Sequence, residues 1–157
     1  ADDILAGRAF PGQNVVIIGG GSVGCELADY LAPLLNDRFI RNRDITILEM
    51  GKEILLTETG AGRSVLVQRM LQKGIHIECN AKVTKVDDDK IYYEQNNCQH
   101  VIENVNTLVF AVGYHVDNAI EKALQETNQP YYLIGDCNKV GNIKDAISMA
   151  YETARKI

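Results

Sequence analysis

The chain has 157 residues, a length typical of one globular domain, with 46% hydrophobic and 24% charged residues. This composition excludes disordered and fibrous proteins, and the length leaves little room for a two-domain enzyme. Sixteen Lys and Arg against twenty-one Asp and Glu give a formal net charge of -5, so we expect neither nucleic acid nor an anionic membrane as a partner.

The first half of the chain alternates strand patterns with amphipathic helix patterns. Residues 14–18 (NVVII) form a β-branched apolar run followed by three glycines, which is typical of a central parallel strand buried on both faces. The expected elements that follow are a helix from Ser22 to near Pro33, a polar connection at 36–44, a strand at 45–50, a loop at 51–63, a helix at 64–74 with Val65, Leu66, Met70 and Leu71 on its apolar side, and a strand at 75–79.

From residue 81 the pattern changes to alternating segments separated by short turns, which predicts an antiparallel β-meander. Its expected strands lie at 82–86, 90–94 and 99–103, with a turn at Asp87–Asp89. Beyond the meander we expect apolar runs at 108–112 and 131–134, a helix at 118–126, and a terminal helix at 143–157 that turns Ile147, Ala150, Tyr151 and Ala154 inward.

The motif Gly19-x-Gly21-x-x-Gly24 carries the strongest chemical signal. It follows a buried-type strand, opens a helix and precedes a second strand that ends in an acidic residue, which is the full dinucleotide-binding fingerprint. We expect Gly19 to permit a tight turn and Gly21 to let backbone N–H groups approach a pyrophosphate at the positive helix end. Gly24 would let the helix pack closely on the strand. The sequence therefore predicts a Rossmann-like α/β fold with a parallel sheet, a glycine-rich β-α-β unit and an antiparallel meander crossover.

Glu49 is the acidic residue of this fingerprint and lies 25 residues after Gly24. A carboxylate here would accept hydrogen bonds from the adenosine ribose and repel a 2′-phosphate, so NADH is favoured over NADPH, although Lys52 reduces that preference. For Arg38, Arg41 and Arg43 a solvated loop is favoured over a phosphate site, because these residues precede the second strand.

The remaining titratable residues give weaker signals. The cysteines are too widely spaced for a compact metal site, and we expect reduced thiols with no assigned role at Cys25, Cys79, Cys98 and Cys137. His76 and His100 lie within strand patterns and indicate no catalysis. His115 follows a strand's carboxyl end, where a nucleotide could approach. We expect no metal site and no catalytic acid, base or nucleophile.

The order of the motifs resembles one known family. GGGSVGCE (19–26), ITILEM (45–50), the meander, TLVFAVGY (107–114) and YYLIGDC (131–137) are similar to the pyridine-nucleotide-dependent flavoprotein oxidoreductases with two dinucleotide-binding domains. The ending GDCNKVGNIKDAISMAYETARKI is most similar to the C-terminal region of the Old Yellow Enzyme-type NADH:flavin oxidoreductases, such as 2,4-dienoyl-CoA reductase and 2-enoate reductase.

The resemblance implies roles for individual residues. It assigns the NADH pyrophosphate to the turn formed by Gly19, Gly20, Gly21, Ser22 and Val23. It places Glu26 near the nicotinamide. It implies contacts of Ala111, Val112 and Gly113 with either nucleotide, and of Gly135 and Asp136 with FAD. The helix from about Ile143 would direct its positive end at the flavin.

Two features depart from the family pattern. Val112 and Tyr114-His115 stand where Thr and Arg-Pro are usual. The FAD domain of the family is split, and its own glycine motif lies far upstream, whereas only 18 residues precede Gly19 here and the chain begins with Ala. We therefore expect an excised segment, with an NAD(H)-binding domain at 1–106 and the C-terminal fragment of an FAD-binding domain at 107–157.

These expectations lead to one function and two alternatives. The leading hypothesis is the NADH-binding segment of a larger flavoprotein, which passes hydride to FAD and electrons to a separate enoate- or dienoyl-type reductase site. The rest of the parent, an FAD half-domain and an FMN barrel, would be its partner, and unpaired strand edges offer a route to a homodimer.

A stand-alone NADH-sensing module is the first alternative, although Gly135-Asp136 would have no purpose there. A methyltransferase is disfavoured because Ile17-Ile18 replace its acidic residue. Without a long apolar run or a basic leader, we expect a cytoplasmic protein.

Overall fold

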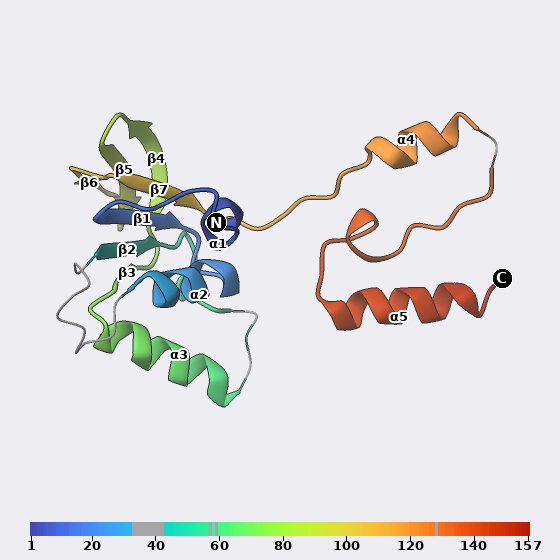
Figure 1. Ribbon diagram of the computed structural model, residues 1–157, viewed down its shortest axis with the longest axis horizontal. Helices are drawn as coiled ribbons and strands as arrows, with labels where there is room; N and C mark the ends of the chain where they lie inside the picture. Colours follow the sequence, from blue (N-terminus) through green and yellow to red (C-terminus); the bar gives the residue numbers. More distant parts are fainter. Residues whose placement is uncertain (33–42, 57, 59, 128) are drawn as a thin grey trace. The chain divides into compact units, whose positions relative to one another are not determined.

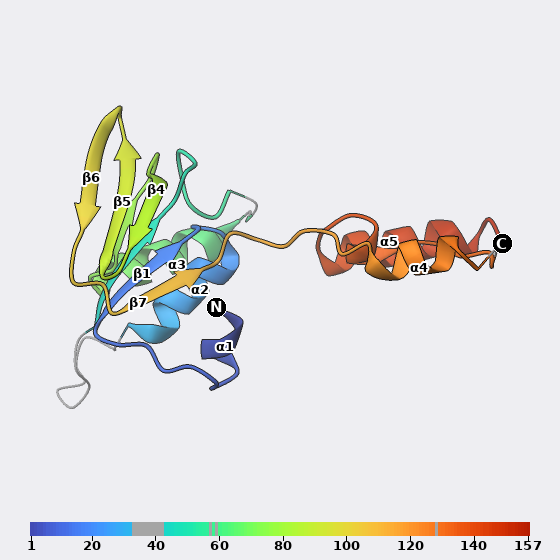
Figure 2. The same cartoon turned by 90° about the horizontal axis from the view of Figure 1, so that it is seen from above.

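The structure is a computed structural model that describes residues 1–32, 43–56, 58, 60–127 and 129–157. It divides into two compact units, Ala1–Gly113 and Tyr114–Ile157 (Figures 1 and 2). Each unit is described by itself.

The first unit contains a parallel sheet and an antiparallel sheet. The parallel sheet has the strand order β3-β2-β1-β7, and the antiparallel sheet has the order β4-β5-β6. The elements are α1 (Asp2–Leu5), β1 (Asn14–Ile18), α2 (Ser22–Leu31), β2 (Asp44–Leu48), α3 (Ala61–Gln72), β3 (His76–Glu78), β4 (Lys82–Asp87), β5 (Lys90–Gln95), β6 (Cys98–Ile102) and β7 (Thr107–Phe110).

These elements form three layers, with the parallel sheet in the middle (Figure 1). Helices α2 and α3 cover one face, and the meander β4–β6 covers the other. Both faces of the central strands are therefore buried: Ile17 packs on the helix side and Val16 on the meander side. Burial on both faces explains why β1 reads as a continuous apolar run in place of an alternating one.

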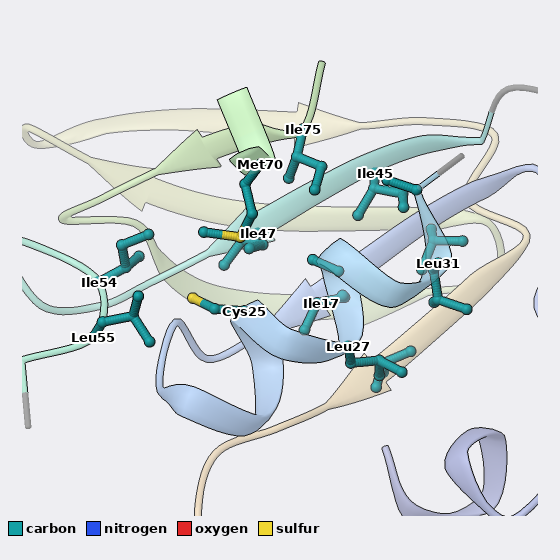
Figure 3. Close-up of a cluster of buried hydrophobic side chains, with 14 residues drawn as sticks. Ile17, Cys25, Leu27, Leu31, Ile45, Ile47, Ile54, Leu55, Met70 and Ile75 are labelled. Carbon is teal, nitrogen blue, oxygen red and sulfur yellow. The ribbon is translucent and has the colours of Figure 1, made fainter. Parts of the chain in front are cut away.

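The core on the helix side is aliphatic. Figure 3 shows Leu27 and Leu31 of α2 packed with Ile17 and Ile45 of the sheet, and Met70 of α3 beside them. All five side chains are at most 5% exposed. Burial of each such side chain contributes about 1.5–3 kcal/mol to folding, so this layer fixes the position of α2 against β1.

The expected fold class is confirmed, with local differences in the first unit. Helix α3 begins at Ala61, three residues before the start at 64 that the sequence predicts. Its buried side is formed by Leu66, Val67 and Met70, whereas Val65 and Leu71 are more than half exposed, because only the stripe that faces the core is covered. The expectations for Pro33, Arg38 and Arg41 fall outside the described residues.

The boundary between the units also differs from the expected one. We expected the first domain to end at residue 106, but the first compact unit extends to Gly113. The reason is that β7 pairs in parallel with β1, from Val15 opposite Thr107 to Ile18 opposite Phe110. The apolar run that follows the meander is thus a strand of the first unit's sheet.

The second unit is made of helices and connecting segments. It contains α4 (Ala119–Gln125), the short 3-10 helix η1 (Gly135–Cys137) and α5 (Ile143–Ala154). None of its described residues is buried. The expected inward face of α5 is wrong, since Ile147 is 64% and Tyr151 62% exposed. Residues 131–134 form no strand either, because the described part of this unit offers no strand to pair with.

One ion-pair cluster joins α2 to α3. Asp29 of α2 accepts hydrogen bonds from Arg69, with Nε 2.8 Å from Oδ1, and forms an ion pair with Lys73, whose Nζ lies 3.0 Å from Oδ1. Burial alone would raise the pKa of Asp29, but hydrogen bonds from Arg69 and Lys73 outweigh it and hold that pKa below its usual value. Asp29 therefore stabilises the fold while it is ionised.

We expect Asp29→Asn to lower the free energy of unfolding by about 1–2 kcal/mol at neutral pH, because two cationic donors lose their charged acceptor. A lowered folded-state pKa gives stability that is present above the unfolded-state value and is lost as the pH falls through the folded-state value. The difference in the free energy of unfolding between Asp29→Asn and the unsubstituted chain should therefore vanish in strong acid. Urea titrations across this pH range measure it. Asp89→Asn, in an exposed turn, is the control, and an equal loss there would contradict the role of Asp29.

Candidate functional site

The carboxyl ends of β1, β2 and β7 meet at one edge of the parallel sheet. Ile18 is in register with Leu48 on one side and with Phe110 on the other. Gly19, Glu49 and Ala111 follow these strand ends directly. The connection from β1 leads to β2 on one side, whereas β7 lies on the other side, so β1 stands at the switch point of the topology. Ligands of open α/β sheets bind at such a point.

Close packing explains two of the three motif glycines. Gly19 has a φ of +108°, and a Cβ there would collide with the backbone carbonyl of Ala111. A Cβ on Gly24 would collide with the carbonyl oxygen of Gly19. The turn and the first turn of α2 are therefore in backbone contact, as expected from the motif.

Gly21 differs from its neighbours because a Cβ there would meet no atom within 4 Å. It is exposed, has a φ of -73° that any residue tolerates, and is the N-cap of α2. No side chain in the described part of the chain caps this helix. The amide of Cys25 is the first to bond within it, to Gly21, so the amides of Ser22, Val23 and Gly24 have no intrahelical acceptor. An open glycine beside uncapped amides is suited to an anionic ligand.

Glu49 holds the turn from the side of β2. Its Oε2 accepts a hydrogen bond from the amide of Gly20 at 2.6 Å, and its Oε1 accepts one from the amide of Gly51, also at 2.6 Å. The side chain is half-buried. These two bonds fix the carboxylate beside the glycine turn and leave its other lone pairs for a ligand hydroxyl.

The segment after Glu49 forms part of the site, which the sequence interpretation as a plain loop missed. The amide of Leu55 donates to the carbonyl of Gly20 at 2.7 Å. A Cβ on Gly20 would lie only 2.5 Å from Cγ2 of Ile54, so Ile54 packs directly against the turn. Leu55 has a φ of +55°, a strained value for leucine, while its side chain is fully buried. The signal for this contact was the apolar run Ile54-Leu55-Leu56 within an otherwise polar stretch.

Cys25 lies beneath the turn. Its thiol donates to the carbonyl of Gly20 at 3.4 Å and is completely buried. Burial, reinforced by the negative charge of Glu49, raises the pKa of Cys25 to about 12. Burial also raises the pKa of Cys79. All four cysteines are free thiols, and at neutral pH Cys25 is a neutral packing residue with little nucleophilic character.

The structure brings several of the other expected residues to the same edge. Ala111 donates its amide to Ile18 at 2.8 Å and lies against Gly24. Val112 is 68% exposed, and Gly113 has a φ of +88° with open space around it. Val23 and Glu26 are exposed on the first half of α2. The expected nucleotide contacts of these residues stay predictions.

Gly135 and Asp136 belong to the second unit. Gly135 has a φ of +66°. Asp136 accepts a hydrogen bond from the amide of Gly141 at 3.2 Å, which closes the loop that leads into α5. Asn142 and Asp145 form a reciprocal capping box there, so α5 begins at Ile143 as expected.

The minor candidates have structural explanations where the structure describes them. His100 stacks on the ring of Tyr93, and His76 lies 3.6 Å from the carboxylate of Asp44. Arg43 is not merely solvated: it donates to the carbonyls of Gly12 and Leu31, both at 3.2 Å, and so binds the end of α2 opposite the glycine turn. His115 is exposed.

Among the described residues, no group of three or more His, Cys, Asp or Glu side chains could hold a metal ion. None of the helices formed by these residues is both long and apolar enough to cross a bilayer.

The sequence matches known proteins over almost its whole length. The family model described as pyridine nucleotide-disulphide oxidoreductase matches residues 2–150. The chain is 32% identical over 162 residues to a cinnamate reductase of Clostridium sporogenes and 30% identical over 158 residues to an NADH oxidase of Thermoanaerobacter brockii. These alignments cover 100% and 99% of this chain, and 23% of each relative.

A solved structure shows the same fold. A 2-naphthoyl-CoA reductase in complex with 2-naphthoyl-CoA has a TM-score of 0.81 and 28% identity, over 99% of this chain and 23% of that chain. The chain thus spans about a quarter of the length of these proteins. The matches confirm the resemblance on which the sequence interpretation rested.

Proposed function

This chain belongs to the pyridine nucleotide-disulphide oxidoreductase family, and we propose on that premise that it is the NADH-binding segment of a larger flavoprotein oxidoreductase. The observation that carries the proposal is the turn at Gly19–Gly24. It combines open space at Gly21, uncapped amides at the start of α2 and a fixed carboxylate at Glu49. A dinucleotide needs these three features for its pyrophosphate and its adenosine ribose.

The residues present fit a nicotinamide dinucleotide. We propose that the amides of Ser22 and Val23 hold the pyrophosphate, that Glu49 accepts the ribose hydroxyls and that Glu26 lies near the nicotinamide. We further propose that Ala111, Val112 and Gly113 contact either nucleotide. When NADH and FAD are both bound, NADH would supply a hydride that FAD would accept at N5. The chain contributes binding, orientation and electrostatics, and we assign no acid, base or nucleophile among the residues that the structure describes.

For FAD, the proposal rests on Gly135 and Asp136 in the second unit. The positive φ of Gly135 and the bond from Gly141 to Asp136 hold a tight loop at the start of a capped helix, a geometry that suits the approach of a phosphate or ribityl group. We propose that these residues supply part of an FAD site and that the rest of the parent completes it. The isolated chain should therefore show negligible turnover.

We propose that the overall reaction of the larger flavoprotein is an enoate- or dienoyl-type reduction. Because the chain spans only 23% of its relatives, the remaining parts of a parent of that size would supply the other FAD half-domain and an FMN barrel with the reducing site. The names of two relatives, a cinnamate reductase and a 2-naphthoyl-CoA reductase, support an enoate- or dienoyl-type reduction.

We expect the chain to bind NADH more tightly than NADPH by roughly fivefold, because the Glu49 carboxylate repels a 2′-phosphate by about 1 kcal/mol. Glu49→Gln should remove most of that preference, since it removes the charge; the one remaining acceptor oxygen keeps one of the two backbone hydrogen bonds. Titrations that follow NADH and NADPH fluorescence measure both affinities. Glu94→Gln on β5 is the control for net charge. Equal affinities of the unsubstituted chain for the two dinucleotides would contradict the assigned role of Glu49.

A further inference from the structure

A second carboxylate lies at the positive end of α2. The hydroxyl of Ser22, the first residue of that helix, donates to Oε1 of Glu58 at 2.6 Å. This is a charge-assisted hydrogen bond at the position where the proposed function places the pyrophosphate. Glu58 thus occupies, in the free chain, a place suited to a ligand anion.

Hydrogen bonds to the glycine turn hold the backbone that carries Glu58. The amide of Leu55 is bonded to the carbonyl of Gly20, and the amide of Glu58 is bonded to the carbonyl of Leu55 at 3.0 Å. Because Leu55 is also fully buried, the chain is anchored three residues before Glu58. The backbone amide of Glu58 is therefore bonded to a residue that is itself anchored at the glycine turn.

The charges around the turn give this contact its consequence. Glu26, Glu49 and Glu58 are three carboxylates on or beside the turn and α2. Two cations lie close along the chain: Arg63, in the first turn of α3, is paired with Glu53 at 2.6 Å, and Lys52 is exposed and acts on the same Glu53. A pyrophosphate that approaches Ser22 meets the negative charge of Glu58, which repels it.

We propose that Glu58 is a built-in competitor for the pyrophosphate, which lowers the affinity of the turn for dinucleotides. To bind, the ligand must take the Ser22 hydroxyl from Glu58 and displace its carboxylate. Glu58 is then a determinant of affinity that acts through charge and through one shared donor. This inference rests on the proposed function, because it concerns the same turn.

The first test is the affinity of the full chain for NADH with Glu58→Gln. We expect this variant to bind NADH about fivefold more tightly, and the gain to shrink as salt is added, because screening weakens the repulsion. Asp89→Asn removes one negative charge from the turn between β4 and β5 and should leave the affinity unchanged. An unchanged or weaker affinity in Glu58→Gln would overturn the proposal, and so would an equal gain in Asp89→Asn.

A double-mutant cycle tests the shared donor. If Glu58 competes for the Ser22 hydroxyl, Ser22→Ala should cost more affinity for NADH in a Glu58→Ala background, which has no side-chain acceptor at this position, than in the unsubstituted chain. Equal costs in the two backgrounds would overturn the competition. If the parent chain binds NADH and Glu58→Gln does not improve it, only this inference fails. If no variant binds NADH, the proposed function fails and the inference fails with it.

Discussion

Gly21→Val is expected to weaken NADH binding at least a hundredfold and to leave the fold intact. Beyond the neighbouring residues, the structure has no atom within 4 Å of a Cβ at this position, so the side chain branches into open space. Its backbone is extended, with φ -73° and ψ -175°, which valine adopts readily. The isopropyl group would fill the space through which a pyrophosphate must approach the amides of α2.

Two measurements separate binding from folding for this variant. NADH fluorescence titration gives the affinity, and urea denaturation gives the free energy of unfolding, which should fall by no more than about 1 kcal/mol for a poorer N-cap. Gly62→Val is the matched control, because Gly62 is also in open space but lies in α3. NADH binding that survives in Gly21→Val would contradict the pyrophosphate site.

Gly24→Ala is expected to have the largest effect on stability. A single methyl group would collide with the carbonyl oxygen of Gly19 and crowd the Cβ of Ala111. The obstacle is the backbone of Gly19, which directly follows β1 and whose amide is bonded to the carbonyl of Leu48 in β2, so it cannot move aside without opening the sheet edge. We expect a loss of about 3 kcal/mol or more in the free energy of unfolding.

The control for Gly24→Ala is the same substitution at Gly62. Alanine there meets nothing within 4 Å and is a better helix former than glycine, so we expect a gain of about 0.5–1 kcal/mol. Opposite signs at two helical glycines would show that close packing decides the outcome at Gly24. A neutral Gly24→Ala would contradict the tight contact between the turn and α2.

The sequence allowed the parallel sheet and the glycine turn to be predicted because each depends on local chemistry. A β-branched run reports burial on both faces, and three glycines at fixed spacing report a turn with backbone contacts. Strand β1 was predicted with its observed bounds. The meander was predicted to within one or two residues, because alternation and turn residues are short-range signals.

Other features could not be read from the sequence because they depend on tertiary neighbours. The buried stripe of α3 is set by its contact with the core, and several apolar residues fell on the exposed side of that helix. The bond from Leu55 to Gly20 and the contact of Glu58 with Ser22 join positions that are more than thirty residues apart. A pattern within one segment contains no information on such pairs.

The absence of buried side chains in the described part of Tyr114–Ile157 has a consequence for every denaturation experiment on this chain. The denaturant dependence and the heat capacity of unfolding both scale with the surface that becomes exposed. Almost all of that surface belongs to Ala1–Gly113, where the cores lie. The measured transition should thus have the steepness of a protein of about 110 residues, whichever state the remaining helices adopt. Amide exchange in α4 and α5 would proceed without waiting for that transition.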